Sequence, residues 1–208
     1  MRLPVLLVLC QLLTASCWGL VGMRPIRRII ANACGVAVAF MPLGAWSLDN
    51  LITNEKGAFS FKYSDDLMVS PKPVKTHNIE VLLKSEKTKG FIVGLTVDPV
   101  RINSIKDFST PSGLADKVVA VELGRDGVFE TFVLAAQESK VANPSGDTLV
   151  GYDIEYKVES SRGLNHYSSR STIANKKLYV FTAQCKEDSF LEVGENIRQI
   201  LDSLVVGI

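Results

Sequence analysis

A histidine and a glutamate far apart in the sequence, His166 and Glu187, are of the types that bind divalent metal ions. His166 stands where the first strand of a predicted hairpin begins, and Glu187 lies in the loop after the strand that returns beside it. Because the strands of a hairpin are neighbours, the two side chains can converge. One imidazole and one carboxylate suit zinc or manganese, whereas a structural zinc site uses four protein ligands. We therefore expect either a weak metal site or an exposed, polar His166.

Such a two-ligand site predicts that the fold does not depend on the metal. Replacing His166 by alanine is then expected to abolish zinc or manganese binding and to leave the melting temperature of the metal-free protein nearly unchanged.

The other reactive side chains are isolated in the sequence. His77 lies in a proline-rich stretch without a nearby Cys or His, and we expect it at the surface. Cys185 ends a predicted strand beside Lys186, whose charge would lower the pKa of the thiol. The alternative is that Cys185 is an inert, packed side chain.

No pattern in the sequence predicts catalysis. The acidic pairs at residues 65–66 and 187–188 lack the flanking oxygen ligands of a calcium loop, and residues 124–127 form a turn without a phosphate-binding pattern. There is no Ser-His-Asp elbow, HExxH or CxxC motif. A basic stripe with interleaved aromatic residues is also absent from the sequence, which argues against nucleic-acid binding.

The elements that must position these residues are mostly strands. Residues 58–63 alternate, with Phe59, Phe61 and Tyr63 on one face. The remaining predicted strands are residues 79–84, 91–97, 128–141, 148–158, 167–174 and 177–184, with a tight turn at residues 175–176. Residues 128–141 fit both the helical period and the strand period, and their β-branched and aromatic residues favour a strand. Residues 64–78, which contain two prolines, predict an irregular connection.

Two helices are predicted. Thr110 and Pro111 begin the first, which carries Leu114, Val118, Val119, Val121 and Leu123 and ends at Gly124. Asp188 or Ser189 caps the second, whose apolar stripe is Phe190, Ile197, Ile200, Leu201 and Leu204. Consecutive hairpins leave no room for parallel βαβ units. The fold class predicted is α+β, an antiparallel β-sheet covered by helices.

The first 47 residues contain four arginines and no Asp, Glu or Lys, which is the composition of a targeting segment. Residues 1–17 predict a secretory signal peptide, and residues 18–47 a second transfer signal, in which the arginine pair at residues 27–28 precedes an apolar run. A twin-arginine route and a plain export signal both fit this pair. The apolar run of residues 29–45 is shorter than the ~20 residues of a spanning helix, so cleavage is favoured over a retained anchor.

Residues 48–208 predict a single domain. They carry 19 Lys and Arg against 22 Asp and Glu, a net charge of −3. Of the four cysteines only Cys185 lies in this part, so an intramolecular disulfide is excluded there. This absence, and the absence of an N-x-S/T sequon, favour an organelle interior over the cell exterior.

In order and spacing, several segments resemble the PsbP family of thylakoid-lumen proteins. They are GAFSFKY, IKDFSTPSGLADKV, GYDIEYKVES, LNHYSSRSTIANKKLYVFTAQ and the DSL that ends the last helix, within residues 57–206. The resemblance is to PsbP-like and PsbP-domain relatives, and it implies the fold of the family. In the family, a histidine and a loop carboxylate at the positions of His166 and Glu187 are candidate ligands for a divalent metal.

The resemblance implies a non-enzymatic lumenal extrinsic or assembly protein of a photosynthetic complex, most often photosystem II on its oxygen-evolving side. Family members on that side help retain calcium. The paired leader is similar to those of lumen proteins in algae with secondary plastids. Attachment to photosystem subunits at the lumenal membrane face is expected to use lysines such as Lys84, Lys87 and Lys89, and to weaken with salt. The alternative is a lumenal ligand-binding protein or enzyme that uses a pocket between sheet and helices.

Overall fold

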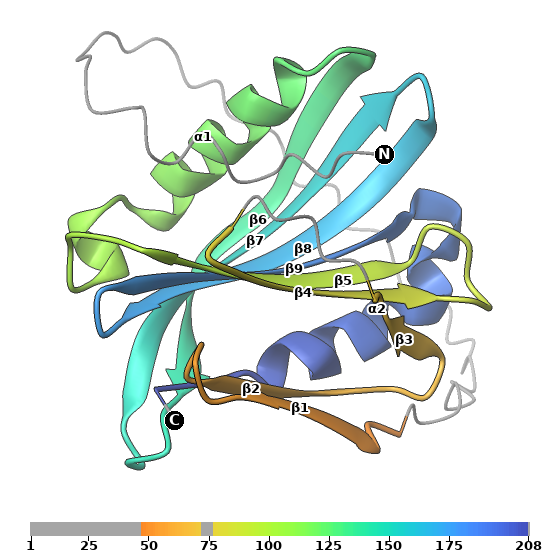
Figure 1. Cartoon of the computed structure of the whole chain (residues 1–208). Helices are drawn as coiled ribbons and strands as arrows, with labels where there is room; N and C mark the ends of the chain where they lie inside the picture. Colours follow the sequence, from red (N-terminus) through yellow and green to blue (C-terminus); the bar gives the residue numbers. More distant parts are fainter. Residues whose placement is uncertain (1–46, 72–76, 208) are drawn as a thin grey trace, which may run out of the picture. The chain divides into compact units, whose positions relative to one another are not determined.

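The computed structural model describes residues 47–71 and 77–207, and these form a curled sheet with two long helices (Figure 1). Both predicted leader segments, apart from Ser47, lie outside the described residues, as do residues 72–76 of the predicted irregular connection. In chain order the elements are β1 (Asn50–Asn54), β2 (Phe59–Tyr63), β3 (Leu67–Val69), β4 (Ile79–Ser85), β5 (Ile92–Pro99), a 3₁₀ turn (Ile105–Asp107), α1 (Pro111–Leu123), β6 (Val128–Ala142), β7 (Thr148–Ser160), β8 (Gly163–Ala174), β9 (Lys177–Lys186), α2 (Glu187–Asp202) and β10 (Val205–Val206).

The ten strands form one sheet in the order β1-β2-β10-β6-β7-β8-β9-β5-β4-β3. Its pairings are antiparallel except one, in which Val205 of β10 pairs in parallel with Ala142 of β6. The predicted class is therefore right in outline, and the structure is a mixed sheet in which strands predominate.

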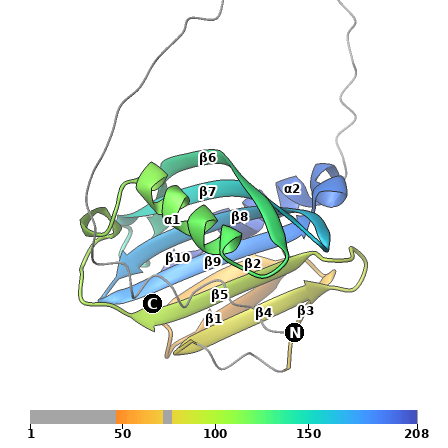
Figure 2. The ribbon, with the colours of Figure 1, turned by 90° about the horizontal axis from the view of Figure 1, so that it is seen from above.

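The two helices cover opposite faces of the sheet (Figures 1 and 2). Residues alternate between these faces along each strand. On β7, Tyr152, Ile154, Tyr156 and Val158 are buried on the α1 side, whereas the residues between them face α2. The residues between them are charged, and they supply much of the site described below.

The main core lies on the α2 side, where β1 and β2 curl over the sheet beside the helix (Figure 1). Phe61 of β2 contacts Phe181 of β9 with ring centroids 4.6 Å apart, although four strands separate them in the sheet order. From α2, Val193, Ile197 and Ile200 are buried in the same cluster. Curling thus lets a single sheet cover its own apolar face.

Local signals explain most boundaries. Thr110 caps α1, its side chain accepting a hydrogen bond from the Gly113 N–H, and Pro111 occupies the first turn. Between β8 and β9, Asn175 and Lys176 both have positive φ, as a two-residue hairpin turn of this type requires.

The sequence predictions were wrong at the short strands and at the start of α2. Three strands, β1, β3 and β10, were not predicted. Strands β3 and β10, with three and two residues, are too short to show alternation, and β1 lacks the aromatic alternation that marks β2. Helix α2 begins at Glu187 and its N-cap is Lys186, not Asp188 or Ser189. In α1, Leu123 was predicted on the apolar stripe but is exposed, and Glu122 is buried instead.

Candidate functional site

His166 is buried on the α2 side of β8 and lies between two carboxylates. Its Nδ1 is 2.9 Å from Glu187 Oε2, and its Nε2 is 2.8 Å from Glu155 Oε1. The side chain is 3% exposed, so the alternative of an exposed polar histidine is wrong. Glu187 is the first residue of α2, not a loop residue, because β9 continues to Lys186.

The two contacts use both ring nitrogens of the imidazole. Each ring nitrogen of His166 has a carboxylate oxygen within hydrogen-bond distance, Nδ1 that of Glu187 and Nε2 that of Glu155. The imidazole therefore links the start of α2 to strand β7.

Two more side chains complete the cluster. The ring of Phe190, one turn into α2, stacks on the His166 imidazole with centroids 3.4 Å apart. Lys157 Nζ lies 2.5 Å from Glu187 Oε1. Burial would raise the pKa of Glu187, but hydrogen bonds from Lys157 and His166 outweigh burial and lower it. Glu187 is therefore an ionised acceptor at the N-terminus of α2, where negative charge is also favoured by the helix dipole.

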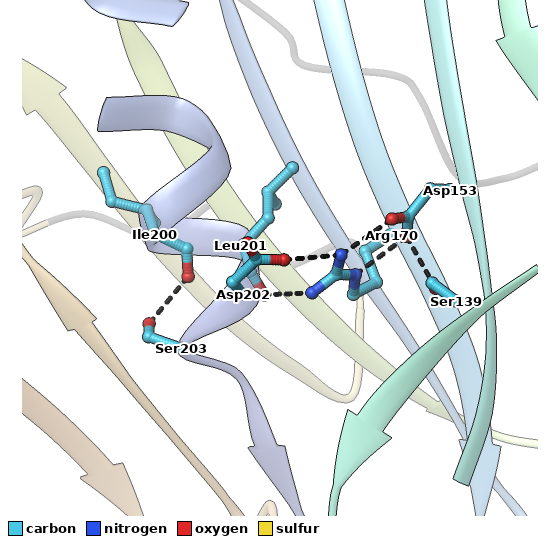
Figure 3. A network of polar contacts seen from close by, with 7 residues as sticks. All are labelled: Ser139, Asp153, Arg170, Ile200, Leu201, Asp202 and Ser203. Carbon is cyan, nitrogen blue, oxygen red and sulfur yellow. Dashed lines mark hydrogen bonds and ion pairs between the residues drawn. The ribbon is translucent and has the colours of Figure 1, made fainter. Parts of the chain in front are cut away.

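Arg170, four residues along β8, holds the other end of α2 (Figure 3). Its Nε and Nη2 donate to both oxygens of Asp153, at 2.8 and 2.7 Å. Nη1 donates to the Leu201 carbonyl at 2.9 Å, and Nη2 lies 2.8 Å from Asp202 Oδ1. Burial would lower the pKa of Arg170, and the hydrogen bonds to the two aspartates raise it instead. A permanent cation therefore neutralises the last turn of the helix.

A cavity of about 310 Å³ lies between these two clusters. Its lining includes Glu155, Phe190, Arg170, Asp202 and the exposed Arg198. The lining carries charges of both signs, and each charged group already has a partner, either within the lining or beside it. The cavity is therefore lined by paired polar groups where α2 meets the sheet.

A second cavity, of about 650 Å³, lies on the α1 side between the end of the helix and the sheet. Its lining includes Glu122, Arg125, Tyr167, Arg162 and Lys186. Glu122 is buried and pairs through Oε2 with Arg125, while its Oε1 has no hydrogen-bond partner among the described residues. Burial raises the pKa of Glu122 despite the opposing effect of Arg125.

His166 and Glu187 lie close together, as the metal-binding prediction requires, but the donors are few and metal binding stays a prediction. Among residues 47–71 and 77–207, there is no group of three or more His, Cys, Asp and Glu side chains arranged to hold one ion. Glu155 does not supply a third ligand for an ion held by His166 and Glu187, because Glu155 contacts the other ring nitrogen of His166. Calcium is bound by oxygen ligands, so an imidazole nitrogen does not suit it.

Among known protein families, the sequence model of the PsbP family matches residues 51–206 of this chain. The chain belongs to the PsbP family. One relative, the chloroplastic PsbP domain-containing protein 2 of Arabidopsis thaliana, is 32% identical over 89 residues, which are 42% of this chain and 36% of that protein. The chain thus matches about a third of the length of this relative.

The fold is also that of a solved PsbP. The solution structure of cyanobacterial PsbP (CyanoP) from Synechocystis sp. PCC 6803 has a TM-score of 0.63 and covers 84% of this chain and 98% of its own. Sequence identity is 16%, so this likeness concerns the fold alone.

In this PsbP-family domain the other predicted residues lie outside the His166 cluster. Lys84, Lys87 and Lys89 are exposed along the end of β4 and the loop that follows, and among the described residues they form no ion pair. His77 was expected at the surface but is largely buried, with Nδ1 2.7 Å from Asp98. No helix of the described part has the length and apolar character needed to cross a membrane.

Cys185 of the domain is fully buried and pairs with His166 across the strands. Burial, with a contribution from the Glu187 charge, raises the pKa of the thiol to about 12. Of the two possibilities for Cys185, activation by Lys186 is wrong, and an inert packed cysteine fits.

Sequence reasoning missed Glu155, Lys157 and the Arg170–Asp153 pair. A signal was present in β7, where Asp153, Glu155 and Lys157 alternate with buried apolar residues. Three charged residues on one face of a central strand indicate that partners must come from a neighbouring element.

Proposed function

We propose that this protein is a lumenal, non-enzymatic PsbP-family protein that attaches to a photosystem, with photosystem II as the complex. The observation that supports this proposal is family membership over residues 51–206, together with a chloroplastic relative. The proposed location is the thylakoid lumen of a plastid. Attachment is peripheral and goes through protein partners.

The surface proposed for attachment is the lysine group Lys84, Lys87 and Lys89. All three are exposed and without ion pairs in the described residues, so they are available to acidic groups of a photosystem subunit. Contacts between exposed charges are screened over about 8–10 Å at physiological salt. We therefore expect washing of thylakoids with molar salt or alkaline buffer to release the protein.

The test is rebinding of the purified protein to washed thylakoids. Changing Lys84, Lys87 and Lys89 together to glutamate is expected to reduce rebinding at least tenfold. The matched control changes Lys56, Lys62 and Lys176, which are also exposed, to glutamate. Equal rebinding of both triple variants would refute the lysine surface, and resistance of the native protein to both washes would refute peripheral attachment.

We also propose weak binding of zinc or manganese by His166 and Glu187. A metal at Nδ1 would replace the proton there and compete with Lys157 for Glu187, which limits affinity. Calorimetry is expected to show metal uptake by the wild type and none by His166→Gln. The control is His77→Gln, which removes the histidine of another His–carboxylate pair and is expected to keep metal uptake. Equal uptake by wild type and His166→Gln would refute the site.

A second candidate function is ligand carriage in the 650 Å³ cavity. The observation that favours it is the buried Glu122 Oε1, which lacks a donor. Native mass spectrometry of protein isolated from thylakoids would then show a small molecule that Glu122→Gln loses. A single mass equal to that of the polypeptide would refute this candidate.

A further inference from the structure

Strand β6 has an edge that no strand of the described residues covers. It pairs with β7 along its length, whereas on its other side Ala142 alone has a partner, Val205 of β10. The backbone N–H and C=O groups that face outward from the earlier part of β6 are therefore open. Such an edge is a template for another strand unless charges, prolines, β-bulges or strong twist protect it. The register of β6 is irregular between Val128 and Glu130 and between Val133 and Ala135, and it is regular from Ala135 to Ala142.

Large apolar side chains are exposed along the same part of β6. Phe129, Phe132, Val133 and Leu134 are 65, 40, 42 and 48% exposed, and we call them the β6 edge patch. Phe132 and Val133 are neighbours without a bulge between them, so they lie on opposite faces of the sheet. Exposed apolar side chains gathered in this way mark interaction sites.

Two carboxylates next to the patch repel each other. Glu130 of β6 and Glu159 of β7 are cross-strand partners, both are exposed, and neither has an ion pair among the described residues. Like charges directly opposite in a sheet are destabilising. Phe132 lies two residues from Glu130 on the same face. A cation placed between the glutamates would relieve the repulsion, and an apolar group two residues further along would reach Phe132.

The charges of β6 disfavour a second copy as the occupant. The charged residues of β6 are Glu130, Glu138 and Lys140. The register with β7 places Glu138 and Lys140 on the face opposite Glu130, so the same strand of another copy brings no cation to the face of Glu130. Glu138 is already paired with Lys106 at 3.1 Å. Lys157, across from Phe132, is held by Glu187.

We propose that the β6 edge binds an extended segment of a partner protein, which adds a strand to the sheet. Its backbone pairs with β6, a Lys or Arg lies against Glu130 and Glu159, and apolar side chains at alternate positions cover the β6 edge patch. This is recognition by strand addition, in which main-chain hydrogen bonds give affinity and alternate side chains give specificity. The edge is separate from the lysine surface proposed for photosystem attachment, so either proposal can fail alone.

The test uses two synthetic nine-residue peptides of alternating valine and threonine that carry either two lysines or two glutamates. Hydrogen exchange is measured on the full chain and, in parallel, on residues 48–208. We expect the lysine peptide to slow exchange in residues 128–138 at least tenfold and to bind at least tenfold more tightly than the glutamate peptide. The double variant Glu130→Lys/Glu159→Lys is expected to reverse this preference.

The control is Glu192→Lys/Glu195→Lys on α2, which changes the net charge by the same amount and is expected to keep the preference for the lysine peptide. Three outcomes would overturn the proposal. One is equal or absent protection with both peptides. Another is protection of β6 that rises with protein concentration alone, which assigns the edge to a second copy. The third is protection in the full chain that disappears in residues 48–208, which assigns it to residues 1–47.

Discussion

The C-terminal end of α2 is held by Arg170 and its N-terminal end by His166, two residues four positions apart on the same face of β8. Arg170 is a cation at every accessible pH and bonds both a side-chain carboxylate and a backbone carbonyl. His166 contacts two carboxylates, Glu155 and Glu187, and stacks on Phe190. One strand thus holds one end of the helix through a guanidinium and the other end through an imidazole.

The difference between the two ends of α2 is tested most strongly by a substitution of Arg170. Arg170→Met removes the guanidinium and leaves Asp153, Asp202 and the Leu201 carbonyl without their buried donor. We expect a loss of ~3 kcal/mol in the free energy of unfolding, measured by urea denaturation. The control is Arg198→Met, an exposed arginine paired with Glu195 on the same helix, which should cost less than ~0.5 kcal/mol. A loss for Arg170→Met as small as that expected for Arg198→Met would show that the buried contacts of Arg170 do not stabilise the fold.

At the other end, His166→Gln is expected to cost ~2 kcal/mol, because it loses the Phe190 stack and one of two charge-assisted contacts. This replaces the sequence-based expectation that truncation of His166 leaves the melting temperature nearly unchanged, which considered only the loss of a weak, two-ligand metal site. His77→Gln, with one carboxylate contact, should cost about half as much. In the double variant Arg170→Met/His166→Gln the losses should add, since the ends are distant. A large coupling energy would mean that the two ends act as one unit.

The pH dependence separates the ends further. The folded-state pKa of Glu187 is lowered, so its contribution to stability is present above the ordinary value of 4.5 and is lost as pH falls through the lowered pKa. Since Glu187 is partly exposed, we expect less than ~1 kcal/mol. Urea denaturation between pH 3 and 6 should show this loss in the wild type and in Glu195→Gln, and a flatter profile in Glu187→Gln. Parallel profiles for all three proteins would contradict the assignment.

The smallest effect on the free energy of unfolding is expected for a substitution of Lys157. Lys157→Gln removes one partly exposed ion pair to Glu187, worth ~0.5 kcal/mol. Cys185 can report it, because its buried thiol, with a pKa of about 12, should react with a thiol reagent only when this end of the domain opens. Labelling should be about twofold faster in Lys157→Gln than in Lys62→Gln. Fast labelling of the wild type would show that the cysteine is not protected.

Sequence patterns predicted the long elements and the meeting of His166 with Glu187, but not what surrounds them. Thr110, Pro111 and the Asn175–Lys176 turn are local signals, and the elements they bound were found. Phe190 was predicted on the apolar stripe of a helix, yet its stacking on His166 depends on how α2 crosses β8, which no local pattern encodes. Arg170 and Asp153 read as surface charges until the helix that buries them is in place.

Strand β10 has a consequence for how the protein is made. Val205 and Val206 lie between β2 and β6, and the Gly207 N–H donates to the Ala58 carbonyl at 2.8 Å. These contacts join residues about 150 positions apart, so loop closure must precede them. During synthesis from the N-terminus, this closure of the curled sheet is therefore possible only after residues 205–207 have left the ribosome.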